Sequence, residues 1–240
     1  MLGGYLELSN AEIKQTSAKR LLPVGTLAMT RDGRKFRYAK GGATDIVAYN
    51  LLVSADAVAN HANCAVVSAV AAGKRDVNIT LGATAATLDQ YKDGYLVIRD
   101  GTGEGYIYQI EGNGAGDASA NIWVRLRDPI ELALDTTTEV SLNYNPWDLL
   151  VISATDQADH PAGIAHCAVD VSVAPYFWVQ TGGPAPCYGY TTHAKGDTLT
   201  ISGNTAGMVE VDDAAGEPII GVSIYDGVAG EATLVHLFLD

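Results

Sequence analysis

Residues 95–110 read YLVIRDGTGEGYIYQI and carry the strongest β signal in the chain. Two segments rich in tyrosine, isoleucine and valine, which are residue types that favour strands, flank a glycine-rich loop. The loop is too short for any connection except a hairpin turn. We therefore predict two antiparallel strands, at Tyr95–Arg99 and Gly105–Ile110.

The same pattern of short apolar runs, separated by Gly, Asp and Asn, extends in both directions from this hairpin. It predicts further strands at Cys64–Ala71, Val77–Leu81, Ile122–Leu126 and Glu139–Leu142. A second β-rich set follows at Trp147–Ser153, Ala165–Val173, Tyr176–Gln180, Thr198–Ser202, Met208–Val211, Ile219–Ile224 and Thr233–Leu239. Helix is predicted only at Ser54–His61 and Ala85–Tyr91. The predicted fold class is mostly β, with β-sandwich or barrel-like domains at 46–145 and 146–240.

Residues 1–45 do not resemble a closed domain. A short polar start and a possible turn of helix at Ala11–Ala18 precede two strand-like segments, Leu27–Met29 and Lys35–Tyr38, which flank the hairpin signal Asp32-Gly33. We predict an extended N-terminal arm that carries a small hairpin. Forty extended residues can reach about 130 Å, so such an arm could contact a neighbouring subunit.

The composition favours a globular, acidic protein. The 240 residues are 48% hydrophobic and 18% charged, and the net charge of −13 disfavours binding to nucleic acid or to anionic membranes. The first forty residues hold eight basic and three acidic side chains, whereas Asp128 and all later residues hold sixteen acidic and one basic. Two interpretations stay open: the basic end binds an acidic partner, or the two segments fold together and neutralise each other.

An odd number of cysteines, Cys64, Cys167 and Cys187, favours free thiols and a reducing site of synthesis, and leaves a Cys167–Cys187 disulfide open. The N-terminus lacks the pattern of a secretory signal. The longest uncharged run, Val171–Ala194, is broken by proline and glycine, which is not typical of a membrane span. We expect synthesis in the cytoplasm and no membrane partner.

No motif indicates catalysis. Gly101–Gly105 is followed by a predicted strand, so it lacks the helix N-terminus that holds a pyrophosphate. His61 with Cys64 supplies one metal-ligand pair at best, and the His and Cys residues within 160–167 have the wrong spacing for zinc. No Gly-x-Ser-x-Gly elbow occurs. The sequence predicts a protein that is not an enzyme and has no cofactor or metal.

The aromatic cluster Tyr176-Phe177-Trp178 allows two interpretations. On a strand, Tyr176 and Trp178 share one face while Phe177 points to the other, so one face belongs to the core. Exposed rings would suit stacking against a sugar. We favour a role in the core and in a subunit interface over sugar binding.

Several segments, in the same order along most of the chain, resemble structural proteins that decorate the heads of tailed bacteriophages. They include LLPVGTLAMTRDGRKFRYAKGGA (21–43), YKDGYLVIRDGTGEGYIYQIEGN (91–113), RDPIELALDTTTEVSLNYNPWD (127–148) and PYFWVQTGGPAPC (175–187), followed by AKGDTLTIS, GMVEV, PIIGVSI and ATLVHLFLD. None of them is a catalytic signature. The resemblance implies a cement or decoration protein on the capsid exterior, which forms a homo-oligomer that is most commonly a trimer.

On this basis we expect a non-enzymatic virion protein that binds the major capsid protein and stabilises contacts between capsomers. The expected capsid or subunit contacts are basic or apolar: Arg31, Arg34, Arg37 and Lys40, then Leu21, Leu22, Phe36 and Tyr38, together with Tyr176 and Trp178. Arginine suits this role because it pairs with carboxylates through two hydrogen bonds. The alternative is a carbohydrate- or host-surface-binding module of a phage fibre. A tail-associated hydrolase is the weakest hypothesis, because no nucleophile can be named for it.

Overall fold

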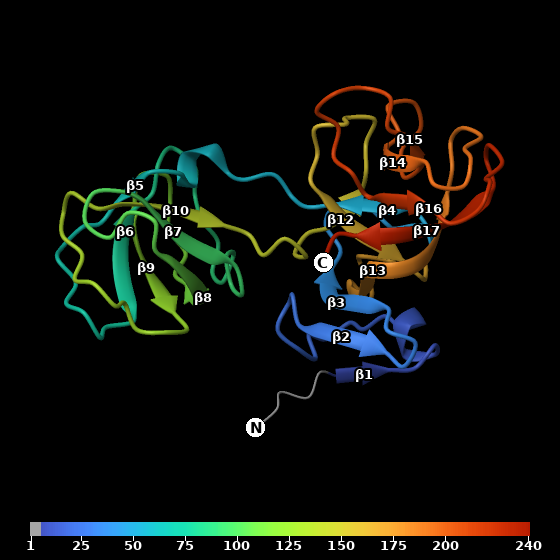
Figure 1. Cartoon of the computed structure of the whole chain (residues 1–240). Helices are drawn as coiled ribbons and strands as arrows, with labels where there is room; N and C mark the ends of the chain where they lie inside the picture. The colour runs from blue at the N-terminus through green and yellow to red at the C-terminus, as the bar shows by residue number, and fades with distance from the viewer. Residues whose placement is uncertain (1–5) are drawn as a thin grey trace. The chain divides into compact units, whose positions relative to one another are not determined.

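The computed structural model describes residues 6–240, and it is almost entirely β, with 41% of residues in strands and 3% in helices. This confirms the prediction of a mostly β fold. The chain divides into two compact units (Figure 1). Residues 6–55 together with Pro146–Asp240 form one, which we call the discontinuous unit, and Asp56–Asn145 form the other, the inserted unit.

The inserted unit is a six-stranded sheet with the order β5-β10-β7-β8-β9-β6, coloured mainly green in Figure 1. Val66, directly after β5, bridges Ile79 in β6, so the two ends of the sheet meet and the barrel is nearly closed. The strands are β5 (Cys64–Ala65), β6 (Asp76–Thr80), β7 (Tyr95–Asp100), β8 (Ile107–Asn113), β9 (Asn121–Leu126) and β10 (Glu139–Asn143).

The hairpin predicted at residues 95–110 is confirmed, because β7 and β8 are antiparallel and Tyr95 lies opposite Gln109. Burial alternates along the strands, as a half-exposed barrel wall requires. In β9, for example, Ile122, Val124 and Leu126 are buried in the barrel core, and the residues between them face outward.

The predicted helices are wrong. Ala86 forms an antiparallel bridge with Gly116, and Asp89 has a φ of 58°, so residues 85–91 turn along the barrel instead of coiling. Within 54–61 only one short 3-10 turn forms, η2 (Ala59–His61). Tertiary pairing has overridden the weak local preference of the alanines for helix.

The discontinuous unit contains a second sheet with the order β1-β2-β3-β13-β17-β16-β14-β15, from which β12, β4 and β11 branch. Its strands are β1 (Leu6–Leu8), β2 (Leu27–Thr30), β3 (Lys35–Lys40), β4 (Leu51–Val53), β11 (Val151–Ile152), β12 (Pro161–Ala165), β13 (Tyr176–Tyr188), β14 (Thr198–Ile201), β15 (Val209–Val211), β16 (Gly221–Ser223) and β17 (Ala232–Phe238). One short 3-10 turn, η1 (Glu12–Lys14), follows β1.

Strand β13 connects the two ends of the chain. Its first half pairs with β3, where Trp178 lies opposite Tyr38, and its second half pairs with β17. A register shift between Gln180 and Gly182 separates the halves. Phe177 and Trp178 belong to different core clusters, which confirms that they point to opposite faces.

The prediction of a separate N-terminal arm at residues 1–45 is wrong for the residues that the structure describes. The predicted hairpin forms as β2 and β3, but β3 pairs along its whole length with β13, and Arg37 forms an ion pair with Asp240. Alternating aromatic residues on β3 and β13 supply the driving force, because they bury each other across the strand pair. The basic and acidic segments therefore fold together, as the second interpretation of the charge asymmetry proposed.

The predicted domain boundaries are partly corrected. The boundary near residue 145 coincides with the end of the inserted unit at Asn145. The boundary at 45/46 lies ten residues earlier than the observed start of that unit at Asp56. The largest correction is topological, because residues 6–55 belong with 146–240 instead of standing apart.

Candidate functional site

Strand β1 lies at the edge of the sheet in the discontinuous unit. It runs parallel to β2, with Leu6 opposite Ala28 and Leu8 opposite Thr30. Within residues 6–240 no strand pairs with its outer edge. An unpaired edge presents backbone N–H and C=O groups that can pair with another chain.

A capping box fixes the chain where β1 ends. The Ser9 backbone N–H donates to Glu12 Oε2 at 2.8 Å, the Ser9 hydroxyl donates to the same oxygen, and the Glu12 N–H donates to Ser9 Oγ at 3.3 Å. These hydrogen bonds hold the pKa of the Glu12 carboxyl below its ordinary value. Ile13, one residue further on, is buried in the core beneath β1. The box and this buried side chain together position the edge strand.

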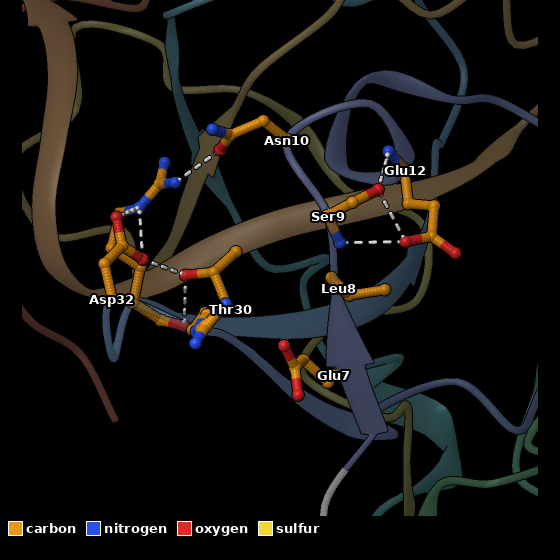
Figure 2. A pocket seen from close by; sticks show the side chains of 9 residues that line it. Glu7, Leu8, Ser9, Asn10, Glu12, Thr30 and Asp32 are labelled. Atoms are coloured by element: carbon orange, nitrogen blue, oxygen red, sulfur yellow. Dashed lines mark hydrogen bonds and ion pairs between the residues drawn. The ribbon is translucent and has the colours of Figure 1, made fainter.

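A polar pocket of about 510 Å³ lies beside β1 (Figure 2). Arg34 bridges two of its walls, because Nε donates to Asp32 at 2.9 Å and Nη2 donates to Asn10 at 2.6 Å. Thr30 also donates to Asp32, and these hydrogen bonds lower the pKa of the Asp32 carboxyl. The lining residues are Glu7, Leu8, Ser9, Asn10, Glu12, Thr30, Arg31, Asp32 and Arg34.

A second pocket, of about 190 Å³, is lined largely by aromatic and leucine side chains, and we call it the aromatic pocket. The Tyr38 ring stacks on Tyr176 with centroids 6.0 Å apart and meets the edge of Trp178 at 5.2 Å. Leu21 stands at its rim, 70% exposed, with its backbone N–H donating to the Tyr38 hydroxyl. The lining residues are Leu6, Leu8, Glu12, Gln15, Thr16, Ser17, Leu21, Tyr38, Tyr176 and Trp178.

The two pockets adjoin, because Leu8 and Glu12 line both. The aromatic pocket, the polar pocket and an unpaired strand edge therefore meet at β1. Neither lining contains histidine, cysteine or lysine, and the Ser9 hydroxyl donates to the Glu12 carboxylate. The arrangement suits recognition of an extended peptide with alternating side chains.

The structure brings six of the ten predicted contact residues to these pockets. Four of them line the aromatic pocket, namely Leu21, Tyr38, Tyr176 and Trp178, and two line the polar pocket, namely Arg31 and Arg34. Arg31 is exposed, and its side chain makes no ion pair or hydrogen bond within residues 6–240. It is the basic group best placed to meet a partner.

The other four predicted contacts lie elsewhere. Phe36 is fully buried, so a partner cannot reach it. Leu22 packs against the core cluster that contains Phe36 and is only partly exposed. Lys40 pairs with Asp148 at 3.6 Å. These three residues and Arg37, which is described next, take part in the internal packing or the ion pairs of the discontinuous unit.

Arg37 is the fourth, and it has three intramolecular partners. Its Nε and Nη2 donate to the two carboxylate oxygens of Asp240 at 2.6 and 2.8 Å, and Nη1 donates to the Gly25 carbonyl. Its guanidinium also lies 4.6 Å from the ring centre of Trp147. The hydrogen bond from Arg37 is the main reason why the pKa of the Asp240 carboxyl is lowered. A side chain held in this way is not free to recognise a capsid.

Residues of β1 and of the turn after it were missed by the sequence prediction. A signal for part of this region was present, because Ser9-x-x-Glu12 is the capping-box pattern. The three-residue strand before it is too short to recognise from alternation alone.

The cysteines and histidines, which were the candidate metal ligands, lie outside the two pockets. Within residues 6–240, no three His, Cys, Asp or Glu side chains gather to hold a metal ion. All three cysteines are free thiols, and burial raises the pKa of the Cys187 thiol to about 12, which keeps it protonated and unreactive. In the same part of the chain, no helix combines the length and the hydropathy of a membrane span.

Comparison with known proteins gives no relative. No family model matches the chain, and neither a curated protein nor a solved structure matches it.

Proposed function

We propose that this protein is a non-enzymatic virion component that binds the outer surface of a tailed-phage capsid and stabilises contacts between capsomers. It is made in the host cytoplasm and acts on the capsid exterior, with the major capsid protein as its partner. Two observations support the proposal: the succession of sequence segments that resemble head-decorating proteins, and an almost entirely β fold in which two pockets flank an unpaired strand edge.

The unpaired edge of β1 between the two pockets is the observation on which the proposal rests. An extended segment of the shell protein would add as a strand beside β1, and its main chain would supply hydrogen bonds. Apolar side chains on one face would enter the aromatic pocket, against Leu21 and Tyr176. Polar or acidic side chains would meet Arg31 in the polar pocket.

Such a contact would stabilise the shell because many copies of the protein bind one particle. A single clamp of ordinary interface size, about 1,600 Å² in total, bridges two neighbouring shell subunits and must break before they separate. Because many clamps act on one particle, the effect of a modest interface is multiplied.

We also propose that the protein associates with itself through the outer face of β13, β17 and β16. These strands contain no Lys, Arg, Asp or Glu, although the chain carries a net charge of −13. Outward-facing Pro184, His236 and Val222 lie in line across the three strands, and Phe238 beside them is 57% exposed. A second copy is the expected occupant, because two acidic molecules can approach with less repulsion through strands that carry no charged side chain. Beside this face, Phe238 lines a hollow together with three charged side chains, Asp32, Lys35 and Asp240.

The alternative of glycan binding on Tyr176 and Trp178 has less support. Trp178 is only 7% exposed and its ring packs against Tyr38, so the two predicted rings do not form a flat platform.

A charge placed at the rim of the aromatic pocket tests shell binding. We expect Leu21→Glu to weaken binding to heads of the encoding phage, purified without this protein, by at least about tenfold, because it would bury an unpaired carboxylate in the interface. Co-sedimentation with the heads measures the affinity. Leu88→Glu is the matched control, since Leu88 is a leucine of similar exposure, 66%, in the inserted unit.

We expect Leu88→Glu to bind like the wild type and both variants to keep the thermal stability of the wild type. Equal binding by Leu21→Glu and the wild type would contradict the proposed binding edge.

A further inference from the structure

We propose that the outer wall of the inserted unit binds a neutral glycan, with Trp123 as the surface on which a pyranose ring stacks. Trp123 lies on β9, where the side chains alternate between core and solvent, and it is 43% exposed. The site is separate from the β1 pockets, and the inference does not depend on the proposed shell binding.

The indole of Trp123 is seated on a glycine. A Cβ atom added to Gly114 would lie 2.8 Å from Nε1 and 3.1 Å from Cδ1 of Trp123, so the five-membered part of the ring lies directly against the glycine backbone. The Gly114 N–H also donates to the Trp123 carbonyl at 2.9 Å. Contact on this side limits the motion of the ring before any ligand arrives. A ring fixed in advance loses little conformational entropy on binding.

Hydrogen-bonding groups lie beside the exposed ring. Asn78 on β6 is directly opposite Trp123, faces outward, and its side-chain amide makes no hydrogen bond within residues 6–240. The indole Nε1–H of Trp123 is equally unpaired in this part of the chain. The amide offers two donors and an acceptor, which matches the hydroxyl pairs of a sugar.

The neighbouring pairs on this wall are already satisfied and hold its shape. Thr80 donates to Asn121 at 2.8 Å on one side of Asn78 and Trp123. On the other side Arg125 bridges Asp76 at 3.1 Å and Glu111 at 3.3 Å. Asn78 and Trp123, whose polar groups have no partner within residues 6–240, thus lie between two cross-strand pairs whose side chains already bind each other.

The charge around the site selects the class of ligand. A tryptophan also stacks on nucleobases and on apolar side chains, but the inserted unit holds twelve acidic and six basic residues. Beside the site, two acids, Asp76 and Glu111, outnumber the single base, Arg125. Phosphates and uronic acids are repelled by such a surface. The apolar face of an uncharged pyranose packs on the electron-rich indole while its hydroxyls reach the amide. A neutral sugar therefore fits both the ring and its surroundings.

The test uses the full-length chain, labelled fluorescently and applied to an array of neutral and anionic bacterial and host glycans. We expect signals confined to neutral glycans. Titration of the strongest neutral hit is then followed for the variants. Trp123→Ala is expected to weaken binding by at least about tenfold, and Asn78→Ala by several-fold, whereas Trp123→Tyr retains most of the affinity because it keeps a stacking ring.

Tyr106→Ala is the matched control, because Tyr106 is an exposed aromatic residue, 38% exposed, elsewhere in the same unit. Its affinity should equal that of the wild type, and circular dichroism should show every variant folded. Three outcomes overturn the inference: no glycan signal with the wild type, signals from anionic glycans alone, or equal affinity for Trp123→Ala and the wild type. None of these results bears on shell binding, which is measured separately with heads.

Discussion

Replacing Phe36 with alanine will destabilise the discontinuous unit by about 3–5 kcal/mol, the usual cost of removing a fully buried phenylalanine. Phe36 is the second residue of β3, and none of its surface is exposed. Its ring lies 5.6 Å from that of His166 on one side, and the Arg34 guanidinium lies 5.9 Å from its centre. Truncation would leave a cavity between the N-terminal strands and β13, where the chain ends are joined.

Hydrogen exchange followed by mass spectrometry localises this effect. Peptides from β3 and the first half of β13 should lose protection in Phe36→Ala, while peptides from β7 to β9 in the inserted unit should not change. Leu21→Ala is the control, since an exposed side chain contributes within about 0.5 kcal/mol. Unchanged protection together with weaker binding to heads would show that Phe36 is an accessible anchor, as the sequence predicted, and not a core residue.

Replacing Phe238 with aspartate will raise the dissociation constant for self-association by about 100-fold, because a carboxylate would face its own symmetry mate in a shared apolar contact. Phe238 is an exposed large apolar side chain on this face, and the centre of its ring lies 5.2 Å from that of His236. The change lies on the side of β17 away from the core, so the fold should be retained.

Sedimentation velocity over a range of micromolar concentrations measures this shift. Ile107→Asp is the control, since Ile107 is an exposed apolar strand residue, 59% exposed, in the inserted unit. Wild type and Ile107→Asp should form the same oligomer, and Phe238→Asp should sediment as a monomer. A monomeric wild type, or a Phe238→Asp variant that still assembles, would show that this face does not mediate self-association.

Local signals were sufficient for most of the strands. The hairpin at residues 95–110 and the turn at Asp32-Gly33 depend on neighbouring residues alone, and both form as predicted. Strand limits shifted where burial is decided at a distance. Pro161–Ala165 is a strand because it pairs with both β4 and β13, whereas the prediction placed a strand at Ala165–Val173.

The position of the N-terminal strands could not be predicted in the same way. Their partners lie far along the chain: Tyr38 meets Trp178, and Arg37 meets Asp240. Counting charges along the sequence suggested a basic arm, but it could not show that two of the counted bases, Arg37 and Lys40, are paired with acidic residues from the later half of the same chain. The sequence pattern therefore identified aromatic and basic residues that form contacts, but it assigned those contacts to a partner instead of to the same chain.

Only part of the candidate site could be predicted from the sequence. The aromatic residues of the pocket were noticed because they cluster in sequence or alternate on a strand, and the pairing of β3 with β13 brought them together. The edge strand β1 and its capping box are local features, yet their importance arises only from their place at the end of the sheet.

An electron cryomicroscopy map of phage heads carrying this protein would show whether the unpaired edge of β1, with its two pockets, binds the shell. We predict density for a shell-protein segment running as a strand beside β1, with an apolar side chain in the aromatic pocket next to Leu21 and Tyr176. A map in which the protein contacts the shell while β1 and Leu21 face solvent would show that another surface binds the shell.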